Sequence, residues 1–409
     1  MATTQLDLLN RQEKLMKLSK VVLLASSGAE SSAQHLEEKI RSRVLKEFNG
    51  GTDQEIEIIS NLCDGPLKFG PRLIKQHNDG ELFTHIQTNV REKDVHFLWK
   101  SRDPNLGIME LLIMGDNLNR AGVNSVTLYA PYLPYMRQDK KDDGRVPISA
   151  RLIFNLLEES FAGKLKRIVS LDLHARQEQG FFSGPLDEFF AVPEFAACYK
   201  HKLKNILEED PSKVMVVGVD AGSAKRCEYF ANLLGVQYTV LDKKRTAHGV
   251  AAHTYHSDVK LEGVTVILPD DIIDSAGSMV GEYEKDKTGP VQYLKERGAT
   301  VLLCATHALF SSKNGITAEE RLAREQVPVL VTDSLPEKYP GYYLKHDPWL
   351  DVLSVDYLLA KAFYCNQTGA SISDFLKRRE TELRSDKLDI VQPTRADYRV
   401  LELDQKKDK

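Results

Sequence analysis

Short apolar runs alternate with amphipathic helical patterns along most of the chain. The clearest runs end in polar or glycine-containing turns and cover residues 95–99, 126–130, 167–171, 214–218, 264–268 and 300–304. Near-continuous apolar runs joined by helical segments are typical of parallel strands with crossover helices, because such strands are buried on both faces. The pattern therefore predicts an α/β fold, in which ligands bind beyond the carboxyl ends of the strands.

Two blocks of the chain repeat the same order of elements. Residues 95–130 run strand, polar turn, helix and strand, and residues 264–305 do the same. The turn of the first block covers 100–105, and it lacks the acidic pair and the small residues of the second turn, 270–278. The repeat predicts two similar halves, of which only the second keeps the acidic pair and the small residues.

The length of 409 residues predicts two domains, because single hydrophobic cores stop growing at ~250–300 residues. We expect a divergent N-terminal segment, 1–70, that joins a first domain over 18–192, and a second domain over 193–350 that begins with a Lys-rich helix near 199–208. A C-terminal helical segment, 351–384, and a partly disordered tail, 385–409, follow, and residues 282–289 suit an exposed loop.

Composition narrows the class of protein. The chain has 42% hydrophobic and 28% charged residues, which is typical of globular proteins, and its net charge of −4 provides no field for a nucleic-acid partner. It has no leader-like N-terminus and no long apolar stretch, so we expect a cytoplasmic protein with no membrane partner. Five widely spaced cysteines, Cys63, Cys198, Cys227, Cys304 and Cys365, suit buried thiols.

The turn after the run 264–268 carries the clearest chemistry. A phosphate can be held by the small-residue end of this turn, where Gly277 lets the backbone approach and nearby hydroxyls donate. The acidic pair at its start would repel a phosphate but suits vicinal ribose hydroxyls. An ordinary helix cap at Asp274 or Ser275 is the alternative. The predicted ribose 5-phosphate residues are Asp270, Asp271, Asp274, Ser275, Ala276, Gly277 and Ser278.

This turn resembles the ribose 5-phosphate signature of the phosphoribosyltransferase fold. Segments 78–81, 135–141, 172–182 and 242–245 follow the order found in ribose-phosphate diphosphokinases, also called PRPP synthetases, and the likeness runs from about residue 76 to 363. It implies two tandem phosphoribosyltransferase-like domains, each a mainly parallel sheet flanked by helices. It also implies transfer of diphosphate from Mg-ATP to the C1 hydroxyl of ribose 5-phosphate, giving PRPP and AMP.

Physical chemistry and the resemblance together suggest the remaining roles. The guanidinium of Arg137 and the amide of Gln138 could hold nucleotide phosphate and an adenine edge. Lys243 and Arg245 share one face of a strand end and would repel unless an anion such as a transferring diphosphate joins them. The resemblance implies ATP binding by Asp79, Glu81, Arg137, Gln138 and Asp139, catalysis by Lys243 and Arg245, and binding of the cofactor Mg²⁺ by His174 and Asp220.

The resemblance further implies a homo-oligomer built from dimers, with a hexamer among the options. In the family, the turn with Asp79 and Glu81 reaches into a neighbouring subunit, so that subunits share the ATP site. Thr306, His307 and Ser311, which come after the run 300–304, resemble a family segment near a regulatory or subunit-contact surface.

Several positions depart from the family pattern. His77 and Asn78 stand where Phe and Ser are common, and the segment 142–147 lacks the usual Glu before its Pro. Residues 221–223 replace a common His-Gly-Gly type of turn after Asp220, and Ser275 and Ser278 replace Thr while keeping the hydroxyl groups. None of these changes removes a residue to which we assign chemistry.

Two other functions stay open from the sequence. A phosphoribosyltransferase would use the same turn, 270–278, which we call the sugar loop, but it would consume PRPP, and it leaves the segments around Arg137 and Lys243 unexplained. A non-catalytic subunit that regulates an active paralogue would have little reason to keep like charges such as Asp270 and Asp271 together.

Overall fold

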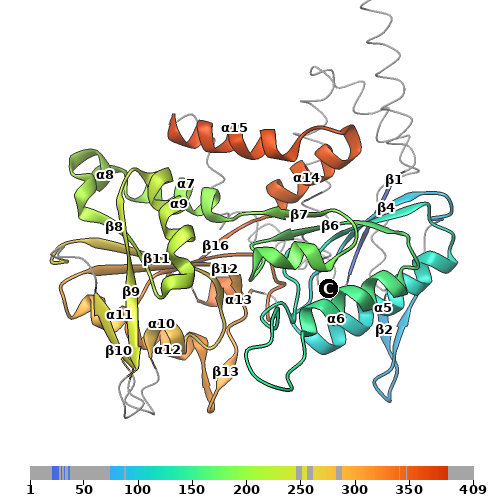
Figure 1. The fold of residues 1–409 in the computed structure, drawn as a ribbon, viewed down its shortest axis with the longest axis horizontal. Helices are drawn as coiled ribbons and strands as arrows, with labels where there is room; N and C mark the ends of the chain where they lie inside the picture. The colour runs from blue at the N-terminus through green and yellow to red at the C-terminus, as the bar shows by residue number, and fades with distance from the viewer. Residues whose placement is uncertain are drawn as a thin grey trace, which may run out of the picture. The chain divides into compact units, whose positions relative to one another are not determined.

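The computed structural model describes residues 21–26, 29, 32, 36, 74–86, 89–245, 251–255, 261–281, 288–339, 341–346 and 348–385. The chain forms two compact units (Figure 1): Met1–Phe189 with Val355–Asp374, and Phe190–Ser354 with Phe375–Lys409. The chain therefore returns to the first unit before it ends in the second. Most of the predicted segments 1–70, 282–289 and 385–409 lies outside the described residues.

The first unit contains a five-stranded parallel sheet with the order β1-β4-β5-β6-β7. Helices α5 (Pro104–Arg120) and α6 (Ser149–Ser160) cover one face (Figure 1). Asp103 caps α5 by accepting from two backbone amides, and Pro104 occupies its first position. The strands are β1 (Val21–Ala25), β4 (Asp94–Leu98), β5 (Ser125–Tyr129), β6 (Leu165–Leu171) and β7 (Leu186–Phe189).

The alternation of side chains along β4 determines what packs on each face of this sheet. Val95 and Phe97 join the core formed with α5 and α6. His96 points to the other face, where its ring lies 4.6 Å from that of Phe363 on α14 (Asp356–Thr368). The Nδ1 atom of His96 lies 2.8 Å from the hydroxyl of Tyr129. The Nε2 atom of Gln367 on α14 lies 2.5 Å from the Nε2 atom of His96. A late segment of the chain thus completes the first unit.

The second unit contains a seven-stranded sheet with the order β10-β9-β8-β11-β12-β15-β16. All neighbours are parallel except β9 and β10, which pair antiparallel. The strands are β8 (Val214–Gly218), β9 (Gln237–Arg245), β10 (Ala251–Tyr255), β11 (Thr265–Ile273), β12 (Thr300–Ala308), β15 (Val329–Thr332) and β16 (Leu350–Leu353). This mainly parallel arrangement confirms the predicted fold class.

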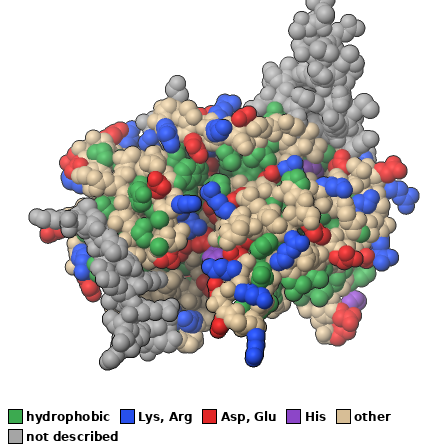
Figure 2. All heavy atoms as spheres, in the orientation of Figure 1, with side chains coloured by type: hydrophobic (Ala, Val, Ile, Leu, Met, Phe, Trp, Pro, Cys, Tyr) green, Lys and Arg blue, Asp and Glu red, His purple; other side chains and the backbone are tan. Residues whose placement is uncertain are grey.

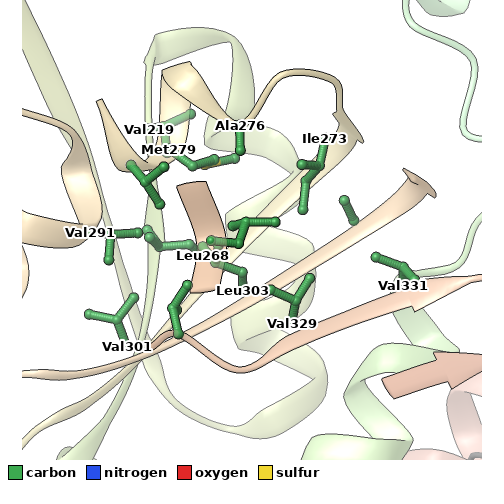
Figure 3. Packing of buried hydrophobic residues seen from close by; sticks show 14 of the residues in the cluster. Val219, Leu268, Ile273, Ala276, Met279, Val291, Val301, Leu303, Val329 and Val331 are labelled. Atoms are coloured by element: carbon green, nitrogen blue, oxygen red, sulfur yellow. The ribbon is translucent and has the colours of Figure 1, made fainter. Parts of the chain in front are cut away.

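Helices cover both faces of the second sheet, and successive residues of β11 pack on opposite sides. Leu268 joins Met279 and Val291 in one apolar cluster (Figure 3), whereas Ile267 joins a second cluster with Phe230. The first cluster includes residues of α10 (Gly277–Val280), α11 (Pro290–Lys295) and α12 (Ala318–Glu325), and the second includes residues of α7 (Val192–Lys202) and α9 (Ala224–Leu234). Burial on both faces explains why these strands are apolar without interruption.

Three expectations about element bounds are wrong. β11 extends to Ile273, so Asp270 and Asp271 lie within the strand rather than after it, because the pairing with β12 continues as far as Ala308. The predicted helix 199–208 is two helices, α7 and α8 (Lys204–Glu209). Thr306 and His307 are buried inside β12, which is not the last strand because β15 and β16 follow it, whereas Ser311 after β12 is exposed.

The predicted repeat is present as two strand–helix–strand blocks with parallel strands. In the first block α5 joins β4 to β5, and in the second α10 and α11 lie between β11 and β12. At the end of β4 the first block has a buried cation, Lys100, whose Nζ lies 2.7 Å from the hydroxyl of Ser32. The corresponding strand end of the second block has the acidic pair.

The described surface and thiols agree with the composition. Acidic and basic side chains are interspersed over the face shown in Figure 2. Cys198, Cys227, Cys304 and Cys365 are free and buried, as predicted, while Cys63 lies outside the described residues. Among the helices that the structure describes, none combines the length and apolarity needed to cross a membrane.

We predict that Arg379→Ala will lower the free energy of unfolding by about 3–5 kcal/mol, because it leaves a buried carboxylate without its partner. Arg379 of α15 (Ile372–Arg384) donates to both carboxylate oxygens of Glu194, at 3.0 and 2.8 Å, and both side chains are largely buried. Chemical denaturation measures the loss. The exposed pair Arg378–Glu382 on the same helix is the control, and Arg378→Ala should cost about 0.5 kcal/mol or less. Equal losses would contradict the prediction.

We also predict that His96 destabilises the fold in acid. Burial lowers the pKa of His96 from 6.5 to about 4, against the opposing effect of Asp94. The unfolded chain therefore binds a proton that the folded chain excludes, and stability falls as the pH drops from 6.5 towards 4. Between pH 7.5 and 5, wild type should lose about 2 kcal/mol more unfolding free energy than His96→Gln. Parallel pH profiles for the two proteins would rule this out.

Candidate active site

The predicted site residues follow the carboxyl ends of neighbouring parallel strands within each unit. In the first unit, the segment 135–139 follows β5 and the segment 172–174 follows β6. In the second unit, Asp220 follows β8, and the sugar loop begins at the end of the adjacent strand β11. Lys243 and Arg245 lie at the end of β9, on the other side of β8. Each sheet thus brings its own set of candidates to one edge.

The sugar loop turns sharply between β11 and α10. Ala276 adopts the left-handed conformation, with φ of 61°, and its carbonyl accepts from the amides of Met279 and Val280. The segment after β12 fixes the loop, because the amide of Ser311 donates to the Asp274 carbonyl at 3.0 Å. Ser278 is exposed. Backbone hydrogen bonds therefore hold the loop in its shape.

An arginine that the sequence analysis missed lies against the acidic pair. Arg226 Nη1 lies 3.2 Å from Asp270 Oδ1 and 3.4 Å from Asp271 Oδ1. Burial and the neighbouring Asp271 raise the pKa of Asp270 to about 8, and Arg226 opposes that rise. Arg226 is in the first turn of α9, which follows β8. Since β8 pairs with β11, only knowledge of the strand order could have identified this contact.

Asp220 closes a short loop at the end of β8. Its Oδ1 accepts from the amide of Ser223 at 3.1 Å, and the Ser223 hydroxyl donates to its carbonyl at 2.6 Å. Gly218 makes room for that hydroxyl, because a Cβ there would lie only 2.3 Å from Ser223 Oγ. Asp220 itself is exposed. The departure from the family pattern at Ser223 thus builds a hydrogen-bonded turn that still presents the carboxylate at the surface.

In the first unit, the segment 135–139 is anchored on both sides. Tyr135 has a positive φ of 69°, and Met136 is buried in the core. Gln138 Oε1 accepts from the Ser149 hydroxyl at 2.5 Å, and Asp139, which is buried, accepts from Gln177 Nε2 at 2.6 Å. Arg137 is exposed between these anchors. The structure therefore links the segment around Arg137 to the segment that follows His174.

His174 is exposed, and the backbone on either side of it is fixed. Glu188 Oε1 accepts from the amide of Leu173 at 3.1 Å, and Glu178 Oε1 accepts from the amide of Ala175 at 3.0 Å. Burial raises the pKa of Glu178 to about 8, and burial with the nearby Asp172 raises that of Glu188 to about 7. The sequence analysis missed both glutamates, since nothing in the local pattern distinguishes them from surface residues.

Asp79 and Glu81 lie in a separate hairpin formed by β2 (Ile74–Gln76) and β3 (Leu82–Thr84). Gly80 has φ of 97°, and Asp79 Oδ1 accepts from the amide of Glu81 at 3.0 Å, so this carboxylate shapes its own turn. Asn117 of α5 ties the base of the hairpin by donating to the Thr84 hydroxyl at 2.9 Å. The tip is exposed.

The structure describes the predicted catalytic residues and the predicted metal ligands only in part. The backbone of β9 includes Lys243 and Arg245, opposite His253 and Ala251 of β10, but their side chains lie outside the described residues. Within the described part of the chain, no three His, Cys, Asp or Glu side chains are grouped to hold a metal ion. His174 and Asp220 belong to different units.

Comparison with known proteins matches both units. A family model described as the N-terminal domain of ribose phosphate pyrophosphokinase matches residues 28–160, and a phosphoribosyl transferase domain matches residues 185–306. Ribose-phosphate pyrophosphokinase of Thermotoga maritima is 34% identical over 82% of this chain and 99% of its own length. The protein of the same name from Campylobacter jejuni is 38% identical over 81% of this chain and 99% of its own.

A solved structure gives the same result. Phosphoribosylpyrophosphate synthetase from Mycobacterium smegmatis superposes with a TM-score of 0.65 at 30% sequence identity. The match covers 85% of this chain and 98% of that protein. Sequence and fold therefore agree over nearly the full length of these relatives.

The contact with the acidic pair predicts a role for Arg226 in sugar binding. Arg226→Ala should raise the KM for ribose 5-phosphate by about 10- to 100-fold, because a hydrogen bond to a charged group contributes ~1.5–3 kcal/mol. Steady-state kinetics with ribose 5-phosphate varied measures the change. The adjacent exposed residue provides the control, and Lys225→Ala should leave this KM unchanged. An unaltered KM in Arg226→Ala would refute the assignment.

Proposed function

The chain belongs to the ribose-phosphate pyrophosphokinase family, and from this membership we infer that it transfers the diphosphate of ATP to ribose 5-phosphate, with PRPP and AMP as products. The observation that carries the inference is the acidic pair on β11 followed by the left-handed turn at Ala276, within a chain that spans nearly all of its relatives' length. Family membership disfavours a phosphoribosyltransferase that consumes PRPP.

We propose that the sugar loop binds ribose 5-phosphate in two parts. The carboxylates of Asp270 and Asp271, beside Arg226, accept from the ribose hydroxyls. The phosphate is held by the turn from Asp274 to Ser278, with Ser275, Ala276 and Gly277 supplying a hydroxyl and backbone amides. The exposed hydroxyl of Ser278 supports this assignment.

We propose that ATP binds to the first unit through Arg137, Gln138 and Asp139. Arg137 is exposed and suited to phosphate oxygens, while Asp139 is buried and orients the segment through Gln177. Asp79 and Glu81 would complete the ATP site of a neighbouring copy, in a homo-oligomer built from dimers. Support comes from the exposed hairpin, where the apolar side chain of Phe83 is 47% exposed.

In the reaction, the C1 hydroxyl loses its proton to solvent and its oxygen forms a bond to the β-phosphorus of ATP, while the bond from that phosphorus to the α–β bridging oxygen breaks and releases AMP. Lys243 and Arg245 are the proposed catalytic residues, because positioned cations stabilise the charge that develops in phosphoryl transfer. The observation in support is that β9 extends to Arg245, so that the two-residue period of a strand groups positions 243 and 245.

We propose Mg²⁺ as the cofactor, held on the protein side by His174 and Asp220. Mg²⁺ is usually bound through one or two protein carboxylates together with substrate phosphates and water. The exposed Asp220 carboxylate and the lack of a larger cluster among the described residues suit such sparse ligation. When bound, the ion would neutralise phosphate charge. A cytoplasmic location is supported by the four free, buried thiols.

Release of AMP tests both the reaction and its catalytic residues. AMP should form only when ATP, Mg²⁺ and ribose 5-phosphate are all present, and Lys243→Ala should lower kcat by about 100-fold or more, since one charge-stabilising donor is typically worth that much. Lys244→Ala, one position along the strand, is the control and should keep near wild-type kcat. If the purified chain releases no AMP, the proposed enzymatic activity is wrong and a non-catalytic subunit is favoured.

A further inference from the structure

Two glutamates fix the backbone on either side of His174. We propose that Glu178 and Glu188 are positioning residues for His174, each accepting a hydrogen bond from one of the two peptide amides that flank it. The inference rests on the proposed function, because the role of His174 towards Mg-ATP is itself a proposal.

The two contacts come from different elements. Glu178 belongs to the short helix η3 (Arg176–Phe181) and accepts from the Ala175 amide at 3.0 Å. Glu188 belongs to β7 and accepts from the Leu173 amide at 3.1 Å through one oxygen. Its other oxygen accepts from Gln179 Nε2 at 2.7 Å. A helix after His174 and a strand beside β6 therefore each fix the amide of one of the two residues that flank His174.

The backbone before His174 needs such support. Asp172 has φ of 36°, a conformation that residues with a side chain rarely adopt. Its amide donates to the Phe189 carbonyl of β7 at 2.9 Å, and the next side chain, Leu173, is buried in the core. β7 thus fixes residue 172 through its backbone and residue 173 through Glu188. The exposed imidazole of His174 therefore follows a strained turn, and surrounding contacts are needed to maintain that turn.

A local helix cap does not account for Glu178. The bond from Glu178 to the Ala175 amide has the form of a capping contact, but capping glutamates are ordinarily solvated. Glu178 is fully buried, and its Oε2 has no hydrogen-bond partner among the residues that the structure describes. Burial raises the pKa of Glu178 to about 8. A buried carboxyl with an unsatisfied oxygen is costly to the fold, so stability alone would favour another residue here.

The helix η3 also contacts the segment 135–139, to which we assign ATP binding. Gln177, next to Glu178, donates to Asp139 Oδ2 at 2.6 Å. A shift of η3 would therefore move both His174 and the segment around Arg137. This connection predicts that losing the Glu178 contact weakens use of Mg-ATP and leaves the sugar site in the second unit unaffected.

The test measures KM for Mg-ATP, KM for ribose 5-phosphate, kcat and the thermal unfolding midpoint on the full chain. Glu178→Ala and Glu188→Ala should each raise the KM for Mg-ATP about tenfold, the loss typical of residues that orient a metal-side ligand. Glu178→Gln should restore it, because the amide oxygen still accepts from Ala175 and the side chain is neutral like the protonated acid. The KM for ribose 5-phosphate should not change.

Two further variants separate positioning from general damage. Glu178→Met fills the same space without a buried carboxyl, so its unfolding midpoint should not fall while its KM for Mg-ATP rises. A wild-type KM in this variant would overturn the inference. The matched control is Glu158→Ala, because Glu158 also accepts from a nearby backbone amide, that of Ser183, at 2.5 Å. This variant should keep the wild-type KM.

The His174→Ala background distinguishes failure of the inference from failure of the proposed function. If Glu178 and Glu188 act through His174, their alanine variants should add little further loss once the imidazole is removed. If His174→Ala keeps the wild-type KM for Mg-ATP, the proposed role of His174 fails. If His174→Ala raises that KM but neither glutamate variant does, His174 keeps its role and the positioning inference is wrong.

Discussion

The central sheet of the second unit is covered by apolar side chains on both faces, and this constraint decides where polar chemistry can lie. Val266 and Leu268 pack to one side of β11 and Ile267 to the other, so no charged side chain fits in the middle of the strand. Charge first becomes tolerable at the carboxyl end, where Asp270 meets Arg226. In the first unit, Arg137, Gln138 and Asp139 likewise come after β5 and His174 comes after β6, whereas Asp79 and Glu81 lie in the separate hairpin of β2 and β3. In both units, the position of the candidate site is a consequence of how the core is packed.

The strand ends that hold the candidate sites include strained backbone conformations and buried carboxyl groups, both of which are unfavourable for folding. Non-glycine residues with positive φ follow four of these strands, at Tyr135, Asp172, Ala276 and Phe310. Each lies within a few residues of a predicted ligand contact or of the segment that holds the sugar loop, and such conformations cost about 1–3 kcal/mol apiece. Three of the carboxyl groups with raised pKa values, those of Asp270, Glu178 and Glu188, lie in or beside the same segments. The apolar core of each unit stabilises the unfavourable groups at its own strand ends.

Local sequence was enough to predict the strands and the fold class, because parallel strands are recognisable from uninterrupted apolar residues. It was also enough to expect site residues near strand ends, since the segments 135–139 and 172–174 come after β5 and β6, whereas Asp270 and Asp271 lie within β11. What it could not provide depends on pairing between distant segments. β11 extends through Asp270 and Asp271 because β12 pairs with it that far, and Arg226 meets the acidic pair because β8 neighbours β11. Nor does any local pattern predict that α14 completes the first unit through Gln367 and His96. The roles of Lys243 and Arg245, and the domain limits chosen from composition, remain predictions.

Under the proposed assignment, the two repeated blocks adapt one scaffold to two ligands of different character. A ribose presents hydroxyl groups that donate to carboxylates, so the second block can keep an acidic pair where its strand ends, provided that a guanidinium compensates for it. A nucleotide presents several anionic phosphates, and carboxylates at the same place would repel them. The first block instead has Lys100 at its strand end, buried and bonded to Ser32, with the exposed Arg137 beyond the neighbouring strand. If ribose 5-phosphate binds to the second unit and ATP to the first, as proposed, the change of sign at the equivalent strand ends follows from the charges of the two substrates.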